Sequence, residues 1–151
     1  MTDAEGRLTF YNEAAAEFWG CRPQLGESKF CGSWKLYWSD GTPLPHDQCP
    51  MAMALHQGRP IRGMEAVAER PDGTRIPFIP YPTPLFDGDG KFTGAVNMLV
   101  DVSHEQASEL AQQAARCRRL SRAMTDVRAS KILAEMAKGY AATAQTLRVT
   151  S

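Results

Sequence analysis

Two short turn signals in the middle of the chain most constrain its fold. The sequences PDGT at 71–74 and DGDG at 87–90 combine residue types that favour tight reversals of the backbone. Segments with the composition of strands flank them at 62–69, 75–85 and 91–102. A chain that reverses at two such turns places its strands side by side in antiparallel order. The middle of the sequence therefore predicts an antiparallel sheet.

The second of these segments carries an unusual number of prolines. Proline has no backbone N–H and is excluded from strands that are paired on both sides. We therefore predict that segment 75–85 is an edge strand, is bulged, or is poorly paired on one flank. The prolines are Pro77, Pro80, Pro82 and Pro84.

The region before the sheet predicts one strand and two short helices. Segment 7–11 alternates and is rich in strand formers, which predicts a strand. Asn12 can cap a helix over 13–19 that ends at Gly20. Residues 20–46 have no periodic pattern and are predicted to be irregular. A second helix follows, with Asp47 as its cap and Pro50 in its first turn, and stops at Gly58.

From Ser103 onward the composition changes to Ala, Gln, Glu and Arg without a proline. Apolar residues recur there at helical spacing, and Thr125-Asp126 interrupts the pattern. We predict two helices that bury their apolar stripes either in an antiparallel hairpin or in a dimer bundle. The fold class is α+β: an antiparallel sheet with short helices on one face over residues 1–103, followed by a helical tail over 104–151.

Charge separates the same two parts. Residues 1–103 contain 9 basic and 13 acidic side chains, whereas residues 104–151 contain 8 basic and 4 acidic ones. The net charge of zero argues against a general binder of nucleic acid or of membrane surfaces. We interpret the arginines of the tail as a solvated face, which makes nucleic acid an unlikely partner.

Location follows from what the sequence lacks. No apolar stretch is long enough to span a bilayer, and the first residues do not have the pattern of a signal peptide. The four cysteines form no CxxC pair, which is typical of reduced thiols. The sequence therefore predicts a cytoplasmic protein with no membrane partner.

Four stretches, in order, resemble the PAS domain of bacterial sensor proteins. TDAEGRLTFYN at 2–12 resembles the entry hairpin of that family, and WSDGTPLP at 38–45 with PMAMAL at 50–55 resembles its loop and helix. ERPDGTR at 69–75 and GKFTGAVNMLVDVS at 90–103 resemble its hairpin and closing strand. The resemblance covers residues 2–103. It implies a five-stranded antiparallel sheet with helices across one face, a cavity for a small molecule, haem or flavin, and an output through the helix after the last strand.

One departure from the family pattern predicts a dimer. The first strand of the family normally precedes the Thr-Asp turn, and here only Met1 precedes it, so the first strand is largely missing. Either the start is truncated, or the strand from Arg7 pairs differently, or a partner chain supplies the missing backbone groups. Sheet edges that lack a neighbour favour pairing with another chain. We therefore predict a homodimer.

Apolar and aromatic residues provide candidate ligand contacts. They would line a pocket for an apolar or aromatic ligand, although a packed core is the interpretation that we favour for most of them. Asn97 is added because it is a polar residue in an otherwise apolar strand. The candidates are Trp34, Tyr37, His46, Met51, Leu55, Phe78, Tyr81 and Asn97.

For cofactors, the preferred interpretation is that none is bound. Haem is the alternative, with His46 ahead of His56 as the iron ligand. Cys31, His46 and Cys49 are weak candidates for a metal site, since a fourth ligand is not evident. The segment GCRPQLG at 20–26 lacks the flanking residues of the reactive cysteine in flavin-binding relatives, which argues against flavin.

We therefore predict a sensory module that binds a small ligand or a partner and relays the change through its C-terminal helices, which would also contact a signalling partner. A ligand-free homodimerisation adaptor and a redox or gas sensor that binds haem or metal are the alternatives. An enzyme is not expected, because no nucleophile–base pair, phosphate loop or carboxylate pair has supporting context.

Overall fold

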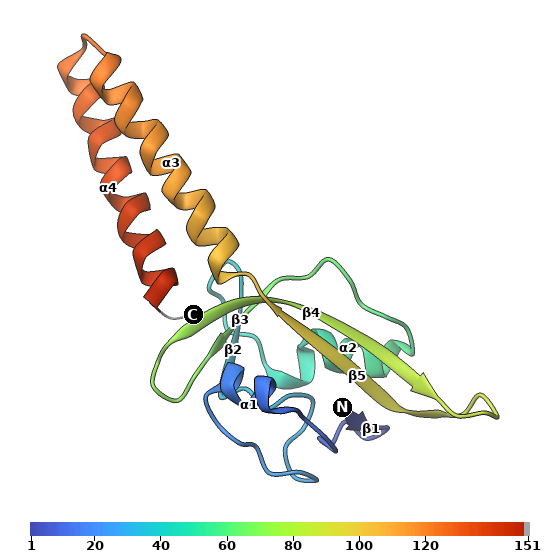
Figure 1. The fold of residues 1–151 in the computed structure, drawn as a ribbon. Helices are drawn as coiled ribbons and strands as arrows, with labels where there is room; N and C mark the ends of the chain where they lie inside the picture. Colours follow the sequence, from blue (N-terminus) through green and yellow to red (C-terminus); the bar gives the residue numbers. More distant parts are fainter. Residues whose placement is uncertain (150–151) are drawn as a thin grey trace. The chain divides into compact units, whose positions relative to one another are not determined.

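The computed structural model describes residues 1–149, and its contacts divide the chain into two compact units (Figure 1). The first unit comprises Met1–Asp101, and the second begins at Val102. The last two residues of the predicted tail, 150–151, lie outside the described part.

The first unit is built on a five-stranded sheet in the order β1-β5-β4-β3-β2, with every neighbouring pair antiparallel. The sheet and the helices beside it confirm the predicted α+β class. The strands are β1 (Thr2–Asp3), β2 (Lys35–Trp38), β3 (Ala66–Glu69), β4 (Arg75–Phe86) and β5 (Phe92–Asp101).

Aspartates close the two turns on which the sheet depends. In the β3–β4 turn, Oδ1 of Asp72 accepts hydrogen bonds from the backbone N–H of Thr74 at 2.9 Å and from its hydroxyl at 2.8 Å. In the β4–β5 turn, Oδ1 of Asp87 accepts from the N–H groups of Asp89 at 3.0 Å and of Lys91 at 2.9 Å. Both predicted reversals are confirmed.

The prolines of β4 lie where that strand is paired on one flank. β4 pairs with β3 only through Arg75–Phe78, whereas it pairs with β5 from Phe78 to Phe86. Within the described residues no strand pairs with residues 79–86 of β4 on the β3 flank, so three of the four prolines need no ladder donor there. The predicted one-sided pairing is confirmed for Pro80, Pro82 and Pro84.

Helix α1 (Glu13–Trp19) has a side-chain cap at each end. Oδ1 of Asn12 accepts from the N–H of Ala15 at 3.0 Å, as predicted. Gly20 ends the helix with a φ of 67°. The guanidinium of Arg70, which follows β3, donates to the carbonyl oxygens of Glu17 and Phe18 at 3.0 Å each. A cation at this end of a helix also interacts favourably with the helix dipole.

Helix α2 (Pro50–Gln57) starts with proline, as predicted, but its cap differs from the prediction. Cys49 is the N-cap residue, and Asp47 lies in a separate turn of 3₁₀-helix at His46–Gln48. Gly58 ends α2 with a φ of 62°. Asp47 lies two residues before the cap position because Pro50, which has no N–H to offer a cap, sets the start of the helix.

The strand predicted at 7–11 is wrong. This segment makes only isolated bridges, Thr2 with Leu8 and Arg7 with Lys29. The N–H of Thr9 donates to the oxygen of Met1 at 3.0 Å, and the N–H of Leu8 donates to the oxygen of Ser28 at 2.8 Å. The segment makes single bridges and no continuous ladder, because one of its neighbours is the two-residue β1 and the other is an irregular loop.

Two further predictions need correction. Residues 35–38, predicted to be irregular, form β2, because they find a partner in β3 more than twenty-five positions away in the sequence. The strand predicted over 62–69 begins only at Ala66, where its pairing with β2 and β4 begins. Both differences depend on pairing between segments that are far apart in the sequence, and the pattern of neighbouring residues does not predict such pairing.

The core lies between the sheet and α2. Helix α2 packs against β4 and β5, and small and large residues together fill the space between them. The buried cluster comprises Leu36, Leu44, Cys49, Met51, Ala52, Ala66, Ala68, Phe78 and Ala95.

The second unit is a hairpin of α3 (Ser103–Ala123) and α4 (Val127–Val149). The hydroxyls of Ser121 and Ser130 each donate to the other residue's carbonyl oxygen at 2.8 Å, next to the turn. Oδ1 of Asp126 accepts from the N–H groups of Arg128 and Ala129, so the predicted break and cap are confirmed. Of the two arrangements that the sequence left open, the chain adopts the hairpin. Over residues 1–149, no helix combines the length and the apolar character that crossing a bilayer requires.

Candidate functional site

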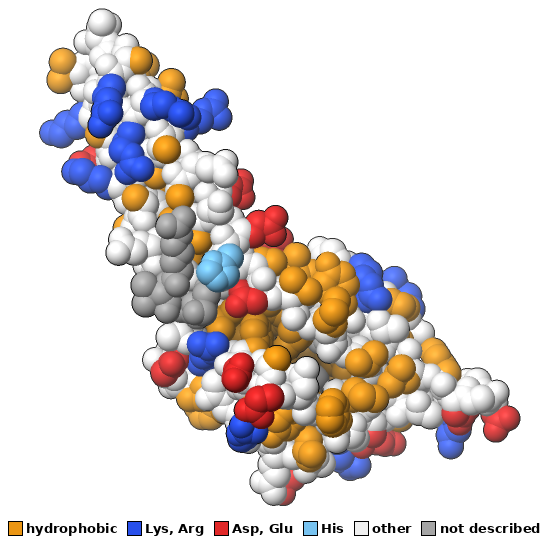
Figure 2. All heavy atoms as spheres, in the orientation of Figure 1, with side chains coloured by type: hydrophobic (Ala, Val, Ile, Leu, Met, Phe, Trp, Pro, Cys, Tyr) orange, Lys and Arg blue, Asp and Glu red, His pale blue; other side chains and the backbone are white. Residues whose placement is uncertain are grey.

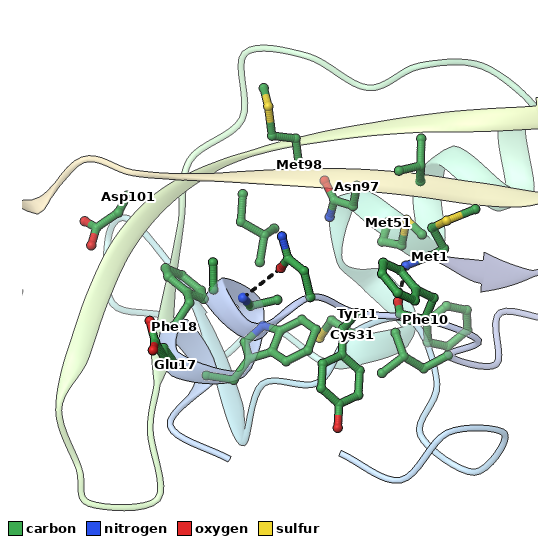
Figure 3. Close-up of a pocket in the computed structure, with 18 of the residues that line it drawn as sticks. Met1, Phe10, Tyr11, Glu17, Phe18, Cys31, Met51, Asn97, Met98 and Asp101 are labelled. Carbon is green, nitrogen blue, oxygen red and sulfur yellow. Dashed lines mark hydrogen bonds between the residues drawn. The ribbon is translucent and has the colours of Figure 1, made fainter. Parts of the chain in front are cut away.

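A groove of about 630 Å³ lies between α1 and β5 in the first unit (Figure 3). The segment 8–12 forms its third side, and Cys31 and Met51 lie at its base. Residues 96–99 and 101 of β5 lie along it, because the β1 pairing of β5 stops at Ala95 and leaves the rest of that edge beside the groove. Figure 2 shows hydrophobic side chains gathered around a hollow on this side of the first unit. Its lining comprises Met1, Leu8, Phe10, Tyr11, Asn12, Ala14, Ala15, Glu17, Phe18, Trp19, Phe30, Cys31, Met51, Arg70, Val96, Asn97, Met98, Leu99 and Asp101.

Aromatic pairs fix the α1 wall of the groove. The ring of Phe18 packs edge-on against Phe78 of β4, with 5.3 Å between centroids, so α1 is anchored to the sheet. Trp19 packs in the same way against Tyr11, with 5.6 Å between centroids. Two alanines of α1, Ala14 and Ala15, leave the space between this wall and β5 unfilled.

Two carboxamides give the groove hydrogen-bond donors. Oδ1 of Asn12 accepts from Ala15, and Oδ1 of Asn97 accepts from the N–H of Tyr81 at 2.9 Å. Because both oxygens are engaged by the backbone, the orientation of each amide is set and its NH₂ group remains as a donor. In residues 1–149, no protein acceptor bonds either NH₂ group. Figure 3 shows Asn97 extending from β5 toward the groove.

The charged groups of the groove lie near its ends. Arg70 and Glu17 lie at the C-terminal end of α1, where Arg70 binds two helix carbonyls. The ammonium group of Met1 lies at the other end and donates to the oxygen of Phe10 at 2.6 Å. Burial lowers the pKa of this ammonium. The middle of the groove is therefore apolar, with amide donors as its main polar feature.

A pair of thiols lies beneath the groove. Cys31 lines both the groove and an adjoining small cavity of about 20 Å³ that Cys49 also lines. A hydrogen bond with Cys49 lowers the pKa of the Cys31 thiol, against an opposing effect of burial, and Ser33 lowers it further. The same interaction and burial raise the pKa of Cys49. Sγ of Cys31 is 2.9 Å from Oγ of Ser33.

Three of the eight ligand contacts predicted from the sequence lie at these cavities. Met51 and Asn97 line the groove, and Phe78 lines the small cavity with them. Leu55 is partly buried against the core instead. Trp34 is 59% exposed and lines neither cavity.

The other predicted contacts are held by neighbours away from the groove. Tyr37 lies under the guanidinium of Arg75, 4.0 Å from the ring centroid, and Tyr81 lies 5.6 Å from that of Arg62. Nε2 of His46 pairs with the carbonyl oxygen of Ser33 at 2.9 Å. These residues stabilise loops and the sheet in the positions where they lie.

The three weak metal candidates, Cys31, His46 and Cys49, are not arranged around one point. In the described part of the chain, no group of three or more His, Cys, Asp or Glu side chains is arranged to hold a metal ion. The reason is that Ser33 lies between the thiols and the imidazole: its hydroxyl contacts Cys31 while its carbonyl oxygen engages His46.

The contribution of α1 to the groove does not follow from the sequence pattern. Its helix was predicted, but Phe18 and Trp19 were not selected as site residues, because a seven-residue helix gives no sign of which strand it will face. The feature of the sequence that could have indicated this role is the short helix that Asn12 caps. It is rich in alanine and carries two large aromatic residues, and such a helix is well suited to form one wall of a cavity.

Comparison with known proteins supports the resemblance seen in the sequence. The family model of the PAS fold matches residues 1–107. No curated protein matches the chain.

Solved structures show weaker similarity. VqmA of Vibrio cholera in a complex with ligand and DNA is 14% identical, with a TM-score of 0.46 over 93% of this chain and 72% of that one. VqmA bound to DPO is 16% identical, with a TM-score of 0.38 over 93% and 80% of the two chains. Both TM-scores are low, so the assignment depends on the family match alone. That match covers most of the chain, and the chain therefore belongs to the PAS family.

Proposed function

We propose that this protein is a cytoplasmic sensory module that binds a small, largely apolar molecule in the groove between α1 and β5. The groove carries the proposal: it is apolar in the middle, open to solvent, and supplied with two amide donors whose orientation the backbone sets. The module acts by binding and relaying, and not as an enzyme.

The size and lining of the groove define the class of ligand. Sites for small molecules typically enclose about 300–1,000 Å³, with mostly apolar walls and a few oriented polar groups. The groove, with about 630 Å³, falls within this range. The donors of Asn12 and Asn97 favour a ligand with a hydrogen-bond acceptor, such as a carbonyl, a ring nitrogen or an anionic oxygen.

The connection between β5 and α3 provides the route for a signal. Five residues of β5 line the groove, and α3 begins at Ser103, only two positions after the last of them. A ligand that binds two arrangements of β5 with different affinity would shift the population of the two, and the following helix would carry the change to a signalling partner. This part of the proposal extends the family's usual output to this chain.

Filling the groove should abolish binding of an apolar probe. We would use 1-anilinonaphthalene-8-sulfonate, which combines aromatic rings with an anionic acceptor, and titrate its fluorescence. The variant Ala15→Phe, with a large ring on the α1 wall, is expected to bind at least about tenfold more weakly. Ala123→Phe, on exposed helix α3, is the matched control and should bind like the parent protein. Equal affinity of the two variants would contradict the proposed site.

The same probe tests the amide donor directly. Asn97→Asp keeps the oxygen that accepts from Tyr81 but removes the NH₂ group and adds a negative charge. Loss of a hydrogen bond to a charged group should weaken binding about tenfold or more. Native mass spectrometry and an absorption spectrum of freshly purified protein would show any molecule already bound, including haem.

Homodimerisation is a second candidate function, favoured by an exposed apolar row on the outer face of β5. Val96, Met98 and Val100 are 37%, 59% and 36% exposed, and they alternate along one face of the strand. Tyr81 of β4 lies opposite Met98 in the register. Such a row is typical of surfaces that associate.

We predict that light scattering at high concentration shows a dimer that Met98→Glu converts to a monomer. A carboxylate in the middle of an apolar interface has no partner and is costly to desolvate. Phe10→Glu, at an exposed apolar position outside this row, is the control. A parent protein that is monomeric at every concentration would exclude this candidate.

A further inference from the structure

We propose that Cys31 and Cys49 are an oxidisable pair: a hydroperoxide that enters the groove oxidises Cys31, and Cys49 then closes an intramolecular disulfide. The proposal does not depend on the small-molecule ligand proposed above. It follows from the position of two thiols that are eighteen positions apart in the sequence and that the fold brings to one small cavity, where Cys31 packs against the core cluster that contains Cys49.

The two thiols differ in their access to solvent. Cys31 is half-buried and forms part of the groove lining, so the groove is the route by which a small oxidant would approach it. Cys49 is 2% exposed and lines only the small cavity beneath. Cys31 therefore lies where the groove adjoins the small cavity, and Cys49 is reached only through that cavity.

Their surroundings assign them different roles. Hydrogen bonds from Cys49 and Ser33 stabilise the thiolate of Cys31 and lower its pKa, which makes Cys31 the nucleophile. The pKa of Cys49 is raised, so this thiol keeps its proton and waits for an oxidised partner. Redox-sensitive pairs in reducing compartments generally combine one accessible, acidic thiol with one resolving thiol.

The chemistry balances with a hydroperoxide as the only co-reactant. The thiolate of Cys31 attacks the terminal oxygen of the hydroperoxide, which breaks the O–O bond, leaves a sulfenic acid on Cys31 and releases an alkoxide that takes up a proton to become an alcohol. The sulfur of Cys49 then attacks the sulfur of Cys31, which forms the S–S bond. The hydroxyl of the sulfenic acid leaves with the proton of Cys49 as water. The two thiols lose two electrons, and the hydroperoxide gains them.

The other cysteines are placed differently. The thiol of Cys21 donates to the carbonyl oxygen of Gly32 at 3.3 Å, and Cys117 lies on helix α3 of the second unit. Neither lines the groove or the small cavity. A disulfide between Cys31 and Cys49 would join the loop at the base of the groove to the first residue before α2, and would thereby fix one part of the groove lining.

Peptide mapping after treatment with hydrogen peroxide tests the proposal on the unaltered protein. The expected result is loss of two hydrogen atoms from the intact mass and one cross-linked peptide that joins Cys31 to Cys49, reversed by dithiothreitol. A cross-link that involves Cys21 or Cys117, or oxidation of all four cysteines at equal rates, would overturn the proposal.

Three variants separate the roles of the two thiols. Cys49→Ser should stop the reaction at a sulfenic acid on Cys31, which dimedone traps as a stable adduct. Cys31→Ser should remove both the adduct and the cross-link. Cys21→Ser is the matched control and should react like the parent protein. Dimedone adducts at Cys49 in the Cys31→Ser variant, in place of an unreactive protein, would show that the assignment of the nucleophile is wrong.

Discussion

Replacing Gly94 by alanine is expected to destabilise the first unit by about 2–4 kcal/mol, since it combines steric overlap with backbone strain. Gly94 pairs with Asp3 across the β1–β5 ladder and has a φ of 146°. A Cβ atom there would lie 2.0 Å from the carbonyl oxygen of Thr2. Because the obstacle is backbone and not the end of a flexible side chain, β1 must move away from β5.

Thermal unfolding of Gly94→Ala measures this effect. For a unit of about 100 residues, each kcal/mol lowers Tm by roughly 4–8 °C, so we expect a fall of about 8 °C or more. Gly88→Ala is the matched control: Gly88 lies in the nearby β4–β5 turn, and no atom lies within 4 Å of its added Cβ. If both variants unfold at the same temperature, β1 is not held against β5 as described.

The second large effect is expected from Phe78→Ala, which should cost about 3–5 kcal/mol. The ring of Phe78 is 5% exposed, belongs to the buried core cluster, and packs edge-on against Phe18. Removing it leaves a cavity under the sheet and also releases the ring that anchors α1. The α1 wall of the groove should therefore become less well ordered, in addition to the loss of folding stability.

Phe86→Ala, in the same strand, provides the comparison. Phe86 is 54% exposed, and its ring contacts only the ring of Phe92 among aromatic neighbours in the described chain. Loss of such a pair on the surface should cost less than about 1.5 kcal/mol. Chemical denaturation with equal m-values gives the difference in free energy of unfolding between the two variants. A cost for Phe78→Ala no larger than that for Phe86→Ala would show that the core does not depend on this ring.

Local chemistry made much of the fold predictable. The turns at 71–74 and 87–90 are closed by aspartate side chains that reach backbone donors two to four residues away, and Asn12 and Asp126 cap their helices over equally short distances. Such interactions depend only on neighbouring residues, so the sequence carries them in full.

The strand predictions that were wrong concern pairing between segments that are distant in the sequence. β2 was not predicted because its residues become a strand only beside β3, and segment 7–11 was predicted as a strand although its neighbours are too short to complete a ladder. For the site, composition suggested aromatic residues in general. It could not show that Trp34 points to solvent while Phe18 and Trp19 face a groove.

The prolines of β4 affect how this protein behaves when concentrated. Pro80, Pro82 and Pro84 alternate, so their nitrogen atoms face the same flank, the one on which the oxygen of Pro82 accepts a bond from Ile61 rather than from β5. A neighbouring molecule that approached this flank would find none of the amide hydrogens that a growing cross-β stack requires at these positions, and the carbonyl oxygen of Pro82 is already bonded by Ile61 and Arg62. The protein thus carries a built-in resistance to filament growth along this border, and substitutions that restore N–H groups there would remove it.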